Sequence, residues 1–303
     1  MELDEIIEFS FCSKRSRNLV KLEWKVENPT VTVYYRGFTG IGVEYSIKGV
    51  KRHVLYSVRK GKILLKNLRF IEDSYFQIAK TGPDEYTTYW ETQEFGVQTL
   101  ASYVTDLLGT SIHTLNISEP CDELMHAIDI VLWVMRRQGS IKTLHYKSSR
   151  DNASEMMYVL DHCKVLDNLY MGMSCNWFPE EPWITVDDLI AMDYCKIEVD
   201  WLEIVPIDLR KFLRHWVDGG SSRLRYMHLR IMQSIDAFRI EQLIWGFNAK
   251  FVRRQEEMDF LGYPFKVKDS YDLHRADGTK ASLILKGPPG GFCSLYMLVW
   301  PLL

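Results

Sequence analysis

Five segments between residues 112 and 229 repeat one hydrophobic pattern. Each has a large apolar residue, two variable residues, a second apolar residue, one variable residue and a third apolar residue, and the copies start at positions 112, 141, 166, 194 and 224. The last two apolar positions alternate with variable positions, which predicts a strand with one buried face and one solvent-exposed face. Such regular spacing is typical of stacked strand-plus-helix units, which present a surface to a partner. Copy by copy, the apolar residues are Ile112, Leu115, Ile117; Ile141, Leu144, Tyr146; Leu166, Leu169, Met171; Tyr194, Ile197, Val199; and Leu224, Met227, Leu229.

A helix is predicted just before the fifth copy. Asp208 can cap its first turn, and Gly219 or Gly220 can take the left-handed conformation that ends it. Its apolar positions follow the i, i+3, i+4, i+7 spacing of one helix face. These positions are Leu209, Phe212, Leu213 and Trp216.

Helical spacing also precedes the other copies. A helix is predicted over residues 122–137, ended by Gly139, and shorter ones before Ile112, Leu166 and Tyr194. Because a strand, a crossover helix and a parallel strand form a right-handed unit, several in tandem give a curved array or a doubly wound sheet. We therefore predict an α/β fold, a leucine-rich-repeat-like array of strand-helix units with a parallel sheet. The alternative is a chance pattern in a chain that is 47% hydrophobic.

Strand patterns dominate both ends of the chain. The region before the array is interpreted as an antiparallel cap, and the region after it as a hairpin with its turn at Asp277 and Gly278, followed by a last strand. We also expect a helix over residues 235–251 and a helical pair over residues 1–21. The expected strands cover residues 30–35, 41–47, 52–58, 62–70 and 86–90 near one end, and 271–275, 280–286 and 292–300 near the other.

Composition narrows the classes of partner. With 37 basic and 40 acidic residues the net charge is −3, which provides no general attraction to nucleic acid or to an anionic membrane. The start of the chain lacks the basic region of a signal peptide and no run is long enough to span a membrane, so we expect a cytoplasmic or nuclear protein. The six cysteines include no CxxC pair, and catalytic and phosphate-binding motifs are missing. We expect no metal, no cofactor and no enzymatic activity.

Residues 1–20 resemble the second half of an F-box, the short helical motif through which substrate adaptors join cullin-based ubiquitin ligases. The resemblance is carried by the acidic and apolar run at residues 3–7, the serine-flanked apolar patch at 9–12 and the basic segment at 13–20. The first half of that motif, with its Leu-Pro signature, has no counterpart here. We therefore expect a partial F-box, arising from an alternative start or from loss of direct docking to the ligase.

Residues 201–231 resemble the nematode F-box-associated domain of type 2. The residues that carry this are Phe212, Leu213 and Trp216, then Gly219 and Gly220, then Leu224, Tyr226 and Leu229. The ending also resembles the carboxyl ends of those proteins, through Arg275, Asp277, Gly278, Ala281, Val299 and Trp300. The family implies substrate recruitment and no catalytic residues. The expected organisation is a partial F-box over 1–25, a β-rich region over 26–95, the repeats over 96–250 and a hairpin region over 251–303.

Two candidate binding surfaces emerge from these patterns. If the F-box remnant is functional, it contacts the cullin-adaptor protein, and if the array is curved, the wet strand positions hold a protein substrate. The mixed charge of that row suits a protein better than a phosphate backbone. The adaptor residues are Leu3, Ile6, Ile7, Phe9 and Phe11, and the substrate residues are Thr114, Asn116, Thr143, His145, Asn168, Tyr170, Lys196, Glu198, Tyr226, His228 and Arg230.

Three functions stay open from the sequence. The first is a substrate-recognition subunit of an SCF-type ubiquitin ligase, and the second is an F-box-derived interaction protein that no longer couples to the ligase. The third is an unrecognised enzyme, which needs a polar pocket with perturbed titrating groups. A face covered by the chain itself is the alternative for the substrate row, because α/β sheets are often buried on both faces.

Overall fold

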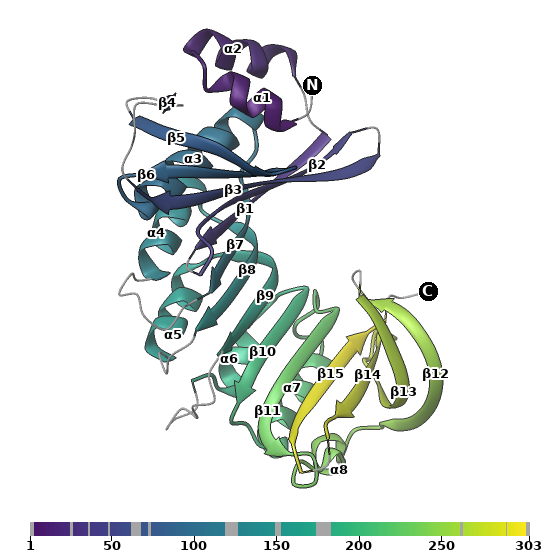
Figure 1. The fold of residues 1–303 in the computed structure, drawn as a ribbon. Coiled ribbons are helices and arrows are strands. Elements are labelled where there is room, and N and C mark those ends of the chain that lie inside the picture. The colour runs from purple at the N-terminus through teal and green to yellow at the C-terminus, as the bar shows by residue number, and fades with distance from the viewer. Residues whose placement is uncertain are drawn as a thin grey trace. The chain divides into compact units, whose positions relative to one another are not determined.

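The fold is mixed α/β with a large, mostly antiparallel sheet (Figure 1). The computed structural model describes residues 3–24, 27–35, 37–47, 49–61, 68–71, 74–118, 127–148, 153–173, 183–260, 263–288 and 290–300. The chain splits into unit 1, Met1–His145 with Asp161–Lys164, and unit 2, Tyr146–Leu160 with Val165–Leu303. The division falls inside the region 96–250 that we expected to form one array.

Unit 1 is a sheet with strand order β4-β5-β6-β3-β2-β1-β7-β8. β1 pairs in parallel with β7, and β3 with β6, whereas β1–β2, β2–β3, β4–β5 and β5–β6 are antiparallel. The strands are β1 (Glu27–Tyr35), β2 (Gly40–Ile47), β3 (Val50–Lys60), β4 (Leu68–Ile71), β5 (Ser74–Gly82), β6 (Glu85–Trp90), β7 (Ile112–Ser118) and β8 (Ile141–Ser148), whose last residues belong to unit 2. The helices are α1 (Leu3–Ser10), α2 (Lys14–Glu23), α3 (Gln93–Leu108) and α4 (Ala127–Gln138).

Buried and more exposed side chains alternate along the strands of unit 1, and the buried ones form a hydrophobic layer beneath α3. In β1 the side chains of Val31 and Val33 are fully buried, and α3 packs on β1, β2, β3 and β6. The close approach of α3 to β3 depends on Gly96, because a Cβ at this position would lie 2.7 Å from Val58 Cγ1. A helix that carries no side chain at the contact can press its backbone against the sheet.

The helical pair expected at the start of the chain is present and packs into unit 1. The Ser13 hydroxyl accepts the Ser16 N–H at 3.0 Å and caps α2, and the Phe11 ring lies 5.2 Å from Phe76 and 5.1 Å from Tyr103. Asp4 on α1 accepts a 2.7 Å hydrogen bond from the Tyr86 hydroxyl. Burial opposes the charged form of Asp4, but hydrogen bonds from the Tyr86 hydroxyl, the Glu5 backbone and Lys80 outweigh it and lower the pKa of Asp4. This carboxylate anchors α1 to the sheet.

Unit 2 is a sheet with strand order β12-β13-β14-β15-β11-β10-β9. β9, β10 and β11 form a parallel ladder, and the other four strands add to it in antiparallel pairs. The elements are α5 (Ala153–His162), β9 (Val165–Met173), α6 (Val186–Ala191), β10 (Lys196–Leu202), α7 (Pro206–Val217), β11 (Tyr226–Ser234), α8 (Ile240–Ile244), β12 (Lys250–Phe260), β13 (Tyr263–His274), β14 (Lys280–Lys286) and β15 (Phe292–Val299), and the end of α5 belongs to unit 1.

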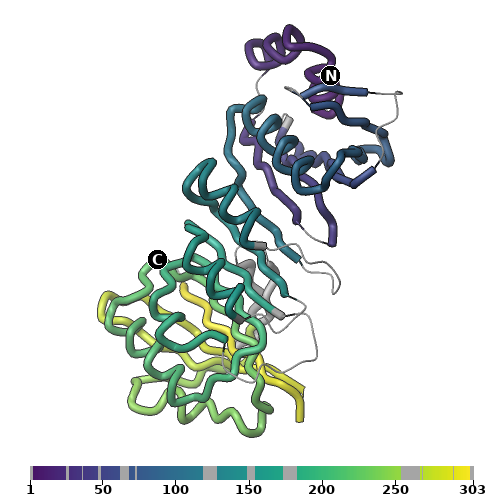
Figure 2. The backbone as a smooth tube through the Cα atoms, turned by 90° about the vertical axis from the view of Figure 1, so that its left-hand side faces the viewer, coloured from purple at the N-terminus to yellow at the C-terminus, as the bar shows by residue number. Residues whose placement is uncertain are grey.

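One face of the unit 2 sheet is buried under helices. The strand residues Ile197, Leu229 and Leu295 are fully buried, and so is the predicted helix face, Leu209, Phe212, Leu213 and Trp216. In Figure 2 the green coils of α7 lie in front of the yellow strands of the same unit. Successive side chains of a strand point to opposite faces, so the intervening residues point away from these helices.

The repeated pattern predicted strands well. All five copies overlap strands, β7 to β11, but the fourth and fifth copies, which begin at Tyr194 and Leu224, become strand only at Lys196 and Tyr226. Helices precede the copies as expected, although the one before Ile112, α3, has 16 residues and is not short. Gly139 and Gly219 have φ angles of +73° and +107°, as expected for residues that end helices. Residues 62–67 and 119–126, which include parts of one expected strand and one expected helix, lie outside the described residues.

Two expectations about helices were wrong, and two strands were not predicted. Asp208 does not cap α7, which begins at Pro206 after Val205, and no side chain caps it. The helix over 235–251 is reduced to α8, because Gly246 takes a φ of +79° and the chain enters β12 at Lys250. The strands β5 and β12 were not predicted.

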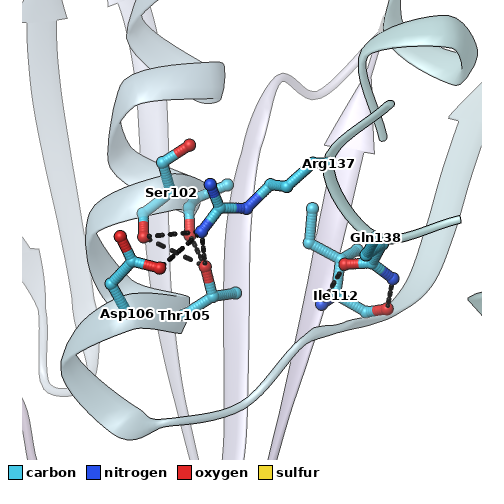
Figure 3. Close-up of polar contacts among 7 residues, drawn as sticks. Ser102, Thr105, Asp106, Ile112, Arg137 and Gln138 are labelled. Carbon is cyan, nitrogen blue, oxygen red and sulfur yellow. Dashed lines mark hydrogen bonds and ion pairs between the residues drawn. The ribbon is translucent and has the colours of Figure 1, made fainter. Parts of the chain in front are cut away.

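Polar side chains on α4 fix unit 1 internally (Figure 3). Arg137 Nη2 donates to Asp106 Oδ1 at 2.6 Å and Thr105 Oγ1 at 3.0 Å, which joins α4 to α3. Gln138 accepts the Ile112 N–H at 2.8 Å and donates to the Ile112 carbonyl at 2.6 Å. The amide thereby satisfies both backbone groups at the first residue of β7, as a neighbouring strand would.

The substitution Gln138→Ala is expected to destabilise the start of β7. It leaves the Ile112 N–H and carbonyl without their side-chain partner, at a cost of about 1–3 kcal/mol. Hydrogen exchange of the Ile112 amide should quicken, whereas Arg136→Ala, at an exposed position in the same helical turn, should leave it unchanged. Equal exchange in wild type and Gln138→Ala would contradict this role.

Candidate functional site

The strand face is the name we give to the side of the unit 2 sheet that points away from α6 and α7. Cross-strand register aligns its side chains in rows, because Lys196 pairs with Asn168 and Tyr226, and Tyr226 pairs with Leu298. The next row is continuous across four strands. Its members are Tyr170, Glu198, His228 and Tyr296.

Lys196 is the centre of the strand face. Its side chain is only 3% exposed, and its ammonium lies 4.8 Å from the centre of the Tyr170 ring and 4.9 Å from that of Tyr226. It forms a 2.9 Å ion pair with Glu198 Oε1. Burial works to lower the pKa of Lys196, but hydrogen bonding to Tyr170 and the Glu198 charge outweigh it and raise the pKa. The charge is therefore kept, and two rings are fixed around it.

His228 stacks on Tyr296 in the neighbouring row. The two rings are parallel, with centroids 4.3 Å apart. Burial, followed by the charges of Arg230 and Lys196, lowers the pKa of His228 from 6.5 to about 4. His228 Nε2 is shielded from solvent and has no hydrogen-bond partner within the described residues. A neutral imidazole with one unsatisfied nitrogen is therefore built into the face.

A β-bulge in β10 shapes the edge of the strand face. The register shifts between Val199 and Leu202, and Trp201 takes a φ of +64°, a conformation that is strained for a tryptophan. The bulge brings the Trp201 ring 5.6 Å from the Arg230 guanidinium and 5.4 Å from the Phe292 ring. Bulges of this kind re-aim side chains, and here the result is an aromatic and cationic edge.

The predicted substrate row is divided between the two units. Four of its residues lie in unit 1 and seven in unit 2, and the structure brings the seven together on the strand face. Thr143, Lys196 and Tyr226 are buried and the other eight are half-buried. The unit 1 residues are Thr114, Asn116, Thr143 and His145; the unit 2 residues are Asn168, Tyr170, Lys196, Glu198, Tyr226, His228 and Arg230.

Four of the five predicted adaptor contacts are used inside unit 1. Leu3, Ile6, Ile7 and Phe11 are buried in the core, and only Phe9, at 43% exposure, offers its side chain to a partner. Buried apolar residues cannot contact a second protein while unit 1 stays folded. The adaptor role of these five residues stays a prediction, with a physical argument against four of them.

Sequence reasoning missed the members of the site that come from other strands. Tyr296 and Lys286 join the face because β15 pairs with β11 and β14 with β15. The alternation in residues 292–300 could place Tyr296 on a wet face, but not beside His228. Trp201 could not be predicted, because its position depends on the bulge.

Within the described residues no three His, Cys, Asp or Glu side chains are placed to hold a metal ion. No helix in the described part of the chain has the length and apolar character needed to cross a membrane.

Comparison with known proteins gives one match. A family model described as F-box associated matches residues 162–229, a segment that contains β9, α6, β10 and α7 and ends within β11. The match shows that this segment is similar to F-box-associated domains. No curated protein and no solved structure matches the chain. The matched segment contains Lys196, Tyr226 and His228 of the strand face.

Protonation of His228 is expected to cost unit 2 stability in acid. The fold lowers the pKa of His228, so the stability that the neutral imidazole contributes is fully present above pH 6.5. This stability falls by roughly 3 kcal/mol as the pH falls towards 4. Urea unfolding of wild type and His228→Gln at pH 7 and at pH 4 measures this difference. His274→Gln, at an exposed histidine of β13, is the control and should follow wild type. The same loss of stability in wild type and His228→Gln would refute the assignment.

Proposed function

We propose that the protein binds a segment of another protein on the strand face of unit 2 and that it acts as a substrate-recognition protein. The observation that carries this is the fixed aromatic and charged row of β9, β10 and β11, which coincides with the F-box-associated match. Tyrosine, tryptophan and arginine are enriched where proteins bind one another, and here Tyr170 and Arg230 lie on the strand face, with the Trp201 ring against Arg230.

The charge of the strand face supports a protein partner. Lys196 pairs with Glu198, and Arg230 lies 3.7 Å from Asp200, so both signs alternate along the surface. A mixed surface selects a partner with the complementary pattern, whereas a phosphate backbone needs uniform positive charge. The half-buried rings are already held in place, so little side-chain freedom is lost on binding.

We propose binding rather than catalysis as the activity of this site. A general base works best with a pKa near the working pH. With a pKa of about 4, His228 is a weak base at neutral pH, and its ring is held against Tyr296. His228 is suited instead to form a fixed part of a contact surface, because its ring is held parallel to that of Tyr296.

We further propose that residues 112–229 are a leucine-rich-repeat-like array. The order α4, β8, α5, β9, α6, β10, α7, β11 alternates helix and strand as such units do. The parallel, in-register ladder of β9, β10 and β11 supports the same interpretation in unit 2.

Two candidate functions differ in whether a bound partner is passed to a ubiquitin ligase. A substrate-recognition subunit of a cullin-based SCF-type ligase is supported by the F-box-associated match and by the resemblance of residues 1–20 to an F-box. An interaction protein without ligase coupling is favoured by the burial of Leu3, Ile6, Ile7 and Phe11 in unit 1. We expect a cytoplasmic or nuclear location for either.

The double variant Tyr170→Ala, His228→Ala is expected to bind its partner at least about tenfold more weakly, since central contacts dominate binding energy. The partner is first isolated by affinity purification with the wild-type chain, and its affinity is then measured by calorimetry. Lys211→Ala with Gln242→Ala, at exposed positions on α7 and α8, is the matched control and should bind like wild type. Wild-type affinity in the first variant, with wild-type melting, would contradict the proposal.

Coupling to a ligase is tested at Phe9. A coupled receptor should co-purify with the cullin adaptor and shorten its partner's half-life, and Phe9→Asp should abolish both while Phe95→Asp, also at an exposed phenylalanine of unit 1, should not. An uncoupled protein should bind the same partner without the adaptor and leave its half-life unchanged. The presence or absence of the adaptor separates the two candidates.

A further inference from the structure

A cavity in unit 1 is lined by one basic face of α2. Lys14, Arg17 and Lys21 lie at i, i+3 and i+7, so they form a single stripe on the helix. The stripe opens on a cavity of about 590 Å³, whose other walls include Tyr103 of α3 and Phe70 of β4. This volume is within the range of small-molecule sites, roughly 300–1,000 Å³.

The central cation of this cavity is held in place. The Arg17 guanidinium carbon lies 4.6 Å from the centre of the Tyr103 ring. Tyr103 is fixed in turn, because its hydroxyl donates to the Ser10 carbonyl at 2.9 Å. Arg17 Nε is shielded from solvent and has no hydrogen-bond partner within the described residues. A guanidinium held in place at the wall of a cavity is suited to an anionic oxygen.

The charge around the cavity is one-sided. Its described lining contains three cationic side chains and no carboxylate, and in the described part of the chain none of the three forms an ion pair. The Asp4 carboxylate of α1 is not part of this lining, and it is engaged by Tyr86 and Lys80. Three cations that converge without a counter-charge favour a ligand with several negative charges.

We propose that this cavity binds an organic polyphosphate. The phosphates are held by Lys14, Arg17 and Lys21, and the apolar or aromatic part of the ligand lies on the Phe70 ring, which is 39% exposed. Stacking on an exposed aromatic ring adds to the binding energy and distinguishes an organic phosphate from an inorganic one. This site is separate from the strand face, and its test does not depend on the proposed function.

Calorimetry of the full chain with ATP, inorganic tripolyphosphate and adenosine tests the site. ATP is expected to bind, tripolyphosphate to bind more weakly, and adenosine not to bind. Raising the salt from 50 to 200 mM should weaken ATP binding several-fold, because exposed charges are screened over about 10 Å or less. Failure of ATP to bind overturns the proposal, and equal affinity for tripolyphosphate overturns the role of Phe70.

Matched variants locate the binding. Lys14→Gln with Lys21→Gln, both at exposed positions, is expected to reduce ATP affinity at least about tenfold without affecting folding, and Arg17→Gln is expected to do the same. Arg15→Gln removes the same charge from an exposed position of α2 outside the cavity and should change affinity less than about twofold. Equal losses in Arg15→Gln and in the cavity variants would show general charge attraction and overturn the proposal.

Cys12 provides a second readout. Its thiol is exposed and lines the cavity, whereas Cys163 and Cys293 are buried. Bound ATP should slow alkylation of Cys12 by iodoacetamide, followed by mass spectrometry of its peptide, in wild type and in Arg15→Gln. Alkylation at the same rate with saturating ATP would place the ligand elsewhere and contradict the assignment.

Discussion

Burial of one face of β10, β11 and β15 against a layer of helices is the constraint on which the strand face of unit 2 depends. Because Ile197, Leu229 and Leu295 must all face α6 and α7, the register of β10, β11 and β15 is determined. The same register aligns the residues between them on the opposite face. The strand face is therefore a consequence of the hydrophobic core, and any slip of one residue in a strand would destroy both.

The buried charge of Lys196 adds a second level of order. An ammonium removed from water is costly unless it is paired, and here Glu198 and two tyrosine rings provide the compensation. Displacement of either ring would remove part of that compensation. His228 is held against Tyr296 by ring stacking. A surface that is rigid before it binds loses little entropy on binding, which suits recognition of a specific segment.

The hydrophobic pattern of the sequence predicted the elements whose burial repeats along a single segment. The strands β7 to β11 and the helix face of α7 follow from periodicity, since burial is repeated along each element. The position of Tyr296 beside His228 depends on an antiparallel pairing between distant segments, and Trp201 depends on a bulge, so neither had a local signal. The apolar residues of the F-box-like segment illustrate a further limit, because the same pattern serves a partner surface or a core. Leu3, Ile6, Ile7 and Phe11 serve the core of unit 1.

The most direct test of the account is site-specific photocrosslinking from the strand face. The variant Tyr170→p-benzoylphenylalanine is irradiated with the isolated partner, and Phe251→p-benzoylphenylalanine, at an exposed position on β12, serves as the control. We predict a covalent adduct with a single segment of the partner from position 170 and none from position 251. Adducts from position 251 alone, or from neither position while the partner remains bound, would contradict binding at the strand face.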